Sequence, residues 1–169
     1  THQFISSGHR HLYLMHLLAS MLLCSATLAQ VNFFDYSFNQ ALKKARKENK
    51  VVMLVMEAAT CAECNAVSNL ALTDPEAFAL NSLTIPLRLS PANELWQILA
   101  TQHYPNKNAA MGLLFFNGVG ELVHLYPSTS SSAQVYVAQA TTALRKQHTP
   151  LPTAASYEAI LQQHPTDTA

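Results

Sequence analysis

The stretch from residue 51 to residue 64 reads VVMLVMEAATCAEC, and it decides the fold. It begins with six consecutive apolar residues and ends with Cys61 and Cys64, which are separated by two residues. A continuous apolar run of this length is typical of a strand buried on both faces, and central parallel strands are the usual case. We therefore predict a central strand at 51–56 that leads into a Cys-x-x-Cys pair.

Helical and strand patterns alternate on both sides of this stretch. Proline at position 86 predicts an edge strand, because it cannot donate a ladder hydrogen bond. Capping residues at Thr73 and at Ser90 predict that a helix starts at each of these two positions. The pattern predicts helices at 38–47, 62–72, 90–99 and 132–144, and strands at 83–89, 113–116 and 121–126. This order predicts an α/β domain in which helices pack on a mixed sheet.

Composition narrows the class of protein. Of the 169 residues, 49% are hydrophobic and 12% are charged, and the ten basic residues balance ten acidic ones. Such a chain can bury one sizeable core, and it is neither disordered nor strongly attracted to polyanions. We therefore expect no nucleic acid among its partners.

The first 29 residues are predicted to be a signal peptide. The apolar run 12–29 follows Arg10 and ends in small residues before Gln30, which is the pattern of a secretory leader. The alternative is an uncleaved membrane anchor, although the run barely reaches spanning length. We expect a periplasmic or secreted protein without stable membrane insertion after cleavage. Its parts would be a leader at 1–29, a domain at 30–148 and a Pro- and Thr-containing tail at 149–169 with a short helix at 155–163.

The cysteine pair is the candidate reactive site. A helix that starts at the pair presents unpaired N–H groups and a partial positive charge, and both stabilise a thiolate on Cys61. Cys64 lies one turn further on, where it can attack a mixed disulfide and release a substrate. The alternatives are an inert structural disulfide and half of a zinc site. Zinc requires two more ligands, and His103 and His124 are isolated in the sequence, so no metal site is predicted.

Two stretches carry a resemblance to a known family. Residues 51–78, VVMLVMEAATCAECNAVSNLALTDPEAF, and residues 112–123, GLLFFNGVGELV, resemble the thioredoxin-like superfamily. Within it they are similar to the C-terminal periplasmic domain of the disulfide reductase DsbD and to small secreted thioredoxin-like proteins. The resemblance implies a thioredoxin fold and thiol–disulfide exchange without an organic cofactor.

The chain departs from the pattern of this family at three positions. Val55 stands where many members carry a buried acid, Thr60 stands where an aromatic residue is usual, and Met111 aligns with the cis-proline. Glu57, four residues before Cys61, is therefore our candidate for the proton carrier of Cys64. The candidate substrate contacts lie between and around the cysteines and at the proline position: Thr60, Ala62, Glu63 and Met111.

These features predict an exported thiol–disulfide oxidoreductase. Glu63 opposes a thiolate at Cys61, so a reductant or a weak exchanger is favoured over a strong oxidant. The expected partners are exported proteins with cysteines or disulfides and a membrane-bound or soluble thiol-redox protein. The alternative from another class is a redox-inert binding or chaperone-like module on the same fold, whose cysteine pair is a structural disulfide.

Overall fold

The structure is a computed structural model, and it describes residues 30–148. The predicted leader, the predicted tail and its helix at 155–163 lie outside these residues. The elements follow in the order α2(Phe38–Glu48), β1(Val51–Met56), α3(Ala62–Thr73), η1(Pro75–Ala79), α4(Leu80–Leu83), β2(Thr84–Leu89), α5(Glu94–His103), η2(Lys107–Ala109), β3(Gly112–Phe116), β4(Leu122–Tyr126) and α6(Ala133–Arg145).

The four strands form one mixed sheet in the order β2-β1-β3-β4. Strand β1 pairs in parallel with β2 and antiparallel with β3, and β3 pairs antiparallel with β4. All six residues of β1 are buried, as expected for a strand with neighbours on both edges and helices on both faces. The prediction of a central strand at 51–56 is confirmed.

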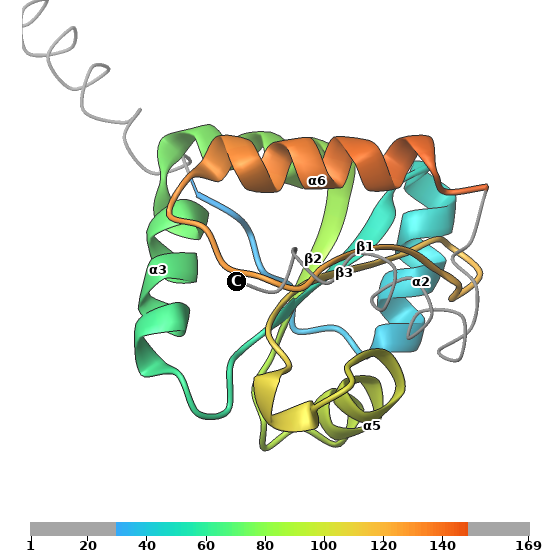
Figure 1. Ribbon diagram of the computed structural model, residues 1–169. Coiled ribbons are helices and arrows are strands. Elements are labelled where there is room, and N and C mark those ends of the chain that lie inside the picture. The colour runs from blue at the N-terminus through green and yellow to red at the C-terminus, as the bar shows by residue number, and fades with distance from the viewer. Residues whose placement is uncertain (1–29, 149–169) are drawn as a thin grey trace, which may run out of the picture.

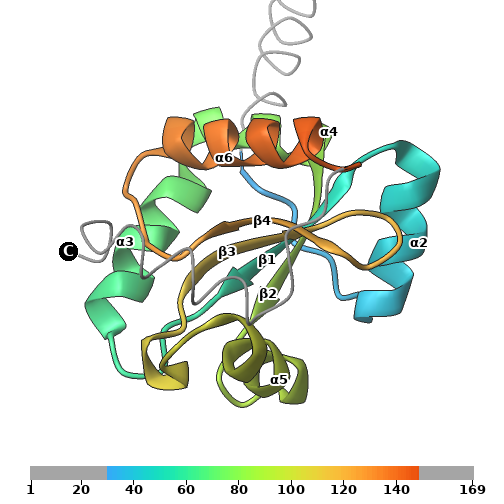
Figure 2. The ribbon, with the colours of Figure 1, turned by 45° about the vertical axis from the view of Figure 1, so that its right-hand side comes forward.

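Alternate residues of β1 supply the two halves of the core. Val52, Leu54 and Met56 belong to the apolar cluster that includes residues of α2 and α5. Val51, Met53 and Val55 belong to the second cluster, which includes residues of α3, η1, α4 and α6. Figures 1 and 2 show the resulting layers, with α6 and α3 on one side of the sheet and α2 and α5 on the other. The predicted packing of helices on a mixed sheet is confirmed.

Strand β2 lies at the edge of the sheet, as Pro86 predicts. The chain before α2 runs beside β2, where the N–H of Phe34 donates to the carbonyl of Pro86 over 3.2 Å. This contact covers part of an edge that would otherwise expose unpaired backbone groups.

Two predicted helix starts are displaced, the first by one residue and the second by three. The cap before η1 is Asp74, whose Oδ1 accepts from the N–H of Glu76 at 2.8 Å, whereas Thr73 is the last residue of α3. Helix α5 begins after Asn93 rather than at Ser90, because the side chain of Asn93 accepts from the N–H of Leu95 at 2.8 Å. An Asp or Asn oxygen satisfies a free N–H of the first turn in both cases.

Candidate functional site: a disulfide at the start of helix α3

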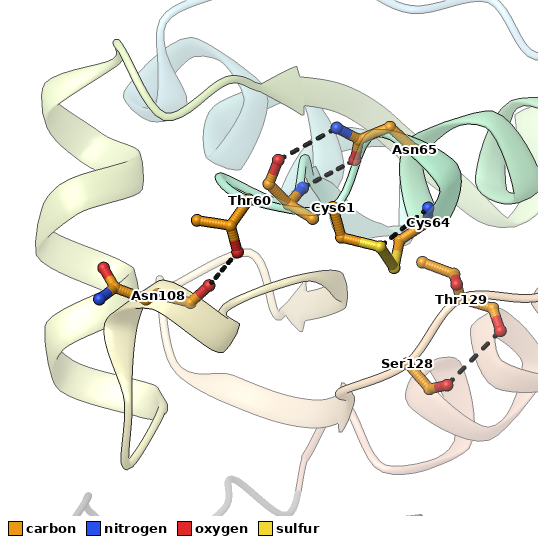
Figure 3. The surroundings of a disulfide bond; sticks show 8 residues. Thr60, Cys61, Cys64, Asn65, Asn108, Ser128 and Thr129 are labelled. Atoms are coloured by element: carbon orange, nitrogen blue, oxygen red, sulfur yellow. Dashed lines mark hydrogen bonds between the residues drawn. A yellow bond between two sulfur atoms is a disulfide. The ribbon is translucent and has the colours of Figure 1, made fainter.

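Three loops meet at one end of the sheet. Strand β1 ends there and leads to the cysteines, strand β3 begins there after η2, and strand β4 ends there before α6. Figure 3 shows residues of all three loops around the disulfide between Cys61 and Cys64. The carboxyl ends of parallel strands are the usual place for sites in α/β proteins.

Cys61 is the N-cap of α3, and its sulfur takes the position that a capping oxygen usually holds. The N–H of Cys64 donates to Sγ of Cys61 over 3.1 Å, and the two Cα atoms lie 5.2 Å apart. Both cysteines are half-buried, so exposure does not distinguish them. Their positions in α3 distinguish them, because only Cys61 faces the free N–H groups of the first turn.

The chain between β1 and Cys61 is held by a series of hydrogen bonds. The N–H of Glu57 donates to the carbonyl of Leu89 at 2.9 Å, which extends the pairing with β2 beyond Met56. The carbonyl of Glu57 accepts from the indole N–H of Trp96 on α5 at 2.9 Å. Trp96 is therefore a core residue that also fixes the strand end next to the site.

Asn65 holds Ala58, the residue that follows Glu57. Its Oδ1 accepts from the N–H of Ala58 at 2.7 Å, and its Nδ2 donates to the carbonyl of Ala58 at 3.1 Å. Sequence analysis did not identify Asn65 as a site residue. Asparagine is a poor helix former whose amide tends to bond with nearby backbone, so its place directly after Cys64 was the signal that could have found it.

The loop before β3 faces the cysteine loop. The hydroxyl of Thr60 donates to the carbonyl of Asn108 at 3.4 Å. Further along this loop, the carbonyl of Met111 accepts from the hydroxyl of Tyr104 at 2.7 Å. Met111 is half-buried, and the structure places its loop at the same end of the sheet as the cysteines. Asn108 and Tyr104 are contacts that sequence analysis missed.

The loop between β4 and α6 completes the surroundings of the disulfide. Ser128 and Thr129 lie on this loop, and Figure 3 draws Thr129 on the side of Cys64. The next residue, Ser130, is anchored because its N–H donates to the hydroxyl of Tyr136 at 3.2 Å. No residue of this loop was predicted to belong to the site, because nothing in the loop sequence indicates that it lies close to residue 64.

The predicted site residues do not all face the sulfur atoms. Thr60, Ala62 and Glu63 are exposed beside the disulfide, where a partner can reach them. The carboxylate of Glu57 is directed to β2, where its Oε1 lies 3.6 Å from a guanidinium nitrogen of Arg88. Arg88 also donates to Oδ1 of Asn69 at 2.6 Å. The pairing of β1 with β2 brings Glu57 and Arg88 together.

Residues 30–148 contain no group of three or more histidine, cysteine or acidic side chains that could hold a metal ion. No helix in the same part of the chain is long and apolar enough to cross a bilayer.

The strand order and the cysteine pair at the junction of β1 and α3 establish the fold. The chain has a thioredoxin-like fold. Two solved structures are similar to it. One is described as DsbH oxidoreductase, with 16% identity and a TM-score of 0.46 over 72% of this chain and 90% of that one. The other is a disulphide isomerase from Xylella fastidiosa Temecula1, with 11% identity and a TM-score of 0.41 over 77% of this chain and 96% of that one.

Neither a family model nor a curated protein matches the sequence. At identities as low as those of the two solved structures, similarity carries no information about activity. The chemistry of this thioredoxin-like chain is therefore derived from its own residues.

Proposed function

We propose that the chain is a thiol–disulfide oxidoreductase in which Cys61 is the nucleophile and Cys64 the resolving thiol. The observation that carries the proposal is the hydrogen bond from the N–H of Cys64 to Sγ of Cys61 at the N-cap of α3. A thiolate at this position accepts the same bond more strongly than a neutral sulfur does, and the helix dipole favours its charge. The sulfur that attacks is thus stabilised before it meets a substrate.

The reaction consists of two exchanges between sulfur atoms. The thiolate of Cys61 attacks one sulfur of a substrate disulfide, forms a mixed disulfide and releases the first substrate thiolate. The thiol of Cys64 then loses its proton and attacks Sγ of Cys61. The disulfide between Cys61 and Cys64 forms, the second substrate thiolate leaves, and the substrate has gained the two electrons that the dithiol lost. No organic cofactor is needed.

Other residues would assist at defined steps. Glu57 is our candidate for accepting the proton of Cys64, since no other carboxylate precedes Cys61 so closely in the chain. Thr60, Ala62 and Glu63 would contact the substrate from the cysteine loop, and Met111 would contact it from the loop before β3. The exposure of the first three residues supports this assignment.

The charge near Cys61 favours one direction of exchange. Glu63 lies in the first turn of α3, and its carboxylate opposes a thiolate at Cys61. Destabilising the thiolate favours the disulfide form and makes the pair a better reductant. We therefore propose a reductant or weak exchanger that acts on exported proteins with cysteines or disulfides. A membrane-bound or soluble thiol-redox protein would restore its dithiol, in the periplasm or outside the cell.

The second candidate function is a redox-inert binding or chaperone-like module. Val55, Thr60 and Met111 favour it, because the family that the sequence resembles usually carries an acid, an aromatic residue and a proline at the matching positions. In this case the disulfide would only brace the start of α3.

The reduction potential of the cysteine pair distinguishes the two candidates. Purified protein would be equilibrated in graded thiol/disulfide buffers, and its free thiols would be alkylated and counted by mass. We expect a reversible two-electron transition between about −280 and −120 mV, the range of working exchange proteins. A pair that stays oxidised until below about −300 mV would be a structural disulfide and would contradict the proposal.

Trapping tests the order of the two cysteines. A Cys64→Ser variant keeps the nucleophile but cannot resolve the mixed disulfide, so it should accumulate covalent adducts with substrate. The matched Cys61→Ser variant should accumulate none. Equal adducts on both variants would show that the two sulfurs are not distinguished by the helix start.

A further inference from the structure

The side-chain amide of Asn65 acts on the backbone as a neighbouring strand would. Strand β1 is paired on both edges as far as Met56, opposite Leu89 on one side and Gly112 on the other. Ala58 lies beyond the strand and is buried, so its peptide groups need partners. The amide of Asn65 satisfies both with its bonds of 2.7 and 3.1 Å.

We call these two hydrogen bonds between Asn65 and Ala58 the clamp. The clamp spans the reactive pair without using either sulfur atom. Ala58 lies three residues before Cys61, and Asn65 directly follows Cys64 (Figure 3). In the oxidised protein the disulfide already joins the two cysteines. When the disulfide opens, that link is lost, whereas the bonds between Asn65 and Ala58 involve no atom that reacts.

We propose that Asn65 is a positioning residue that keeps residues 58–64 closed while the disulfide is open, and that it thereby sets the rate of the resolving step. This role rests on the proposed function. Cys61 ends the chain that leaves β1 and caps α3, and Cys64 lies in the first turn of that helix. Asn65 ties the chain before Cys61 to the helix, so it maintains the effective concentration of Cys64 at the mixed disulfide.

The two exchange steps depend on the clamp to different extents. The first is an attack by Cys61 on an external disulfide, for which this half-buried residue needs only access and the helix N-terminus. The second requires the Cys64 thiolate to approach Sγ of Cys61 in line with the bond to the substrate sulfur, which then leaves as a thiolate. Loss of the clamp should therefore slow the second step more than the first.

A single-turnover experiment separates the steps. Reduced protein would be mixed with one equivalent of an aryl disulfide that releases a coloured thiolate, so each step yields one coloured equivalent. We expect Asn65→Ala to slow the second release by roughly tenfold, the effect of losing one to two net hydrogen bonds. The first release should change by less than about twofold, because it uses no bond of the clamp.

Two further variants make the comparison specific. Asn65→Gln keeps the amide on a longer side chain and should recover part of the second rate. Asn39→Ala is the matched control, since Asn39 is an exposed asparagine on α2, away from the cysteine loop. It should leave both releases unchanged.

The outcomes are distinguishable. Asn65→Ala slowing both releases by the same factor, or neither, would overturn the positioning role while leaving the proposed function in place. A wild-type protein that never releases a second equivalent would overturn the proposed function, and the positioning role with it. If Asn65→Ala does not fold, hydrogen exchange decides: the N–H of Ala58 should be protected in the reduced wild-type protein, and its free exchange would overturn the role.

Discussion

The buried hydroxyl of Tyr136 donates a hydrogen bond to the hydroxyl of Ser68 over 3.0 Å, and this bond joins α6 to the helix that begins at the cysteines. The same hydroxyl accepts from the N–H of Ser130 at 3.2 Å. One oxygen atom therefore connects α3 with the loop beside the disulfide. Ser68 and Tyr136 are both buried, so water cannot take the place of the lost hydrogen-bond partner if this contact is removed.

Removing this hydroxyl should destabilise the protein. For Tyr136→Phe we expect the free energy of unfolding to fall by about 1–3 kcal/mol, because Ser68 and the N–H of Ser130 lose their partner. The matched control is Tyr126→Phe, whose hydroxyl makes no hydrogen bond within residues 30–148 and whose ring packs edge-on against Tyr136. Urea unfolding of both variants measures the difference, and equal losses would contradict the importance of the Ser68 bond.

Gly112 should be intolerant of any side chain. Its φ is +98°, and an added Cβ would meet the carbonyl oxygen of Tyr126 and would lie 2.7 Å from the carbonyl oxygen of Ser128. We expect Gly112→Ala to cost about 2–4 kcal/mol, the sum of backbone strain and overpacking. The clash falls on the loop beside the disulfide, so the reduction potential should also change.

Gly120→Ala provides the control for Gly112→Ala. Gly120 has a similar φ of +92°, but the nearest atom to an added Cβ is Cδ1 of Leu42 at 3.4 Å. Only the backbone strain remains, so the cost should be about 1–2 kcal/mol. Thermal unfolding that ranks the two variants in the opposite order would show that the loop adapts to a side chain at Gly112.

Stability should depend on pH through two half-buried histidines. Burial lowers the pKa of His103 and of His124, although the hydrogen bond between Nε2 of His124 and Gln139 opposes the shift of His124. As the pH falls below about 6.5, the unfolded chain binds protons at these positions before the folded chain does. The free energy of unfolding should therefore decrease over that range.

Variants can assign this pH dependence to its source. His124→Gln should flatten the decline below about pH 6.5, because it removes one of the two groups that take up a proton on unfolding. The pKa of Glu48 is lowered by its hydrogen bonds to Lys44 and Lys50, so its own contribution is lost only at more acidic pH, below the usual glutamate value. Urea unfolding at several pH values tests the assignment, and an unchanged slope in His124→Gln would contradict it.

The proposed proton transfer through Glu57 is tested by Glu57→Gln. The variant keeps the backbone bonds to Leu89 and Trp96, which involve no side-chain atom of Glu57. If the carboxylate takes the proton of Cys64, the resolving step should slow by roughly tenfold or more, and its pH profile should shift. Rates and profiles equal to those of the wild type would leave Glu57 only as the partner of Arg88.

Much of the fold could be predicted because local patterns were strong. Six apolar residues identified β1, Pro86 identified an edge strand, and the patterns on either side of the Cys-x-x-Cys pair placed it at a strand-to-helix junction. The helix starts at Asp74 and Asn93 were missed by one and by three residues, because several capping residues stand close together in each segment.

The contacts that build the site needed the tertiary structure. Asn65 reaches Ala58 because the irregular loop between them folds back on the start of α3. Glu57 meets Arg88 only because β1 and β2 pair in a particular register, which sequence periodicity does not specify.

The sequence by itself therefore determined the alternation of elements, the buried central strand and the position of the Cys-x-x-Cys pair. These depend on hydrophobic period, turn chemistry and residue type, which are local properties. Only the tertiary structure decided which loops surround the disulfide and which side chains hold its flanks. Many of these contacts join residues distant in sequence, and the geometry of all of them depends on how the whole core packs.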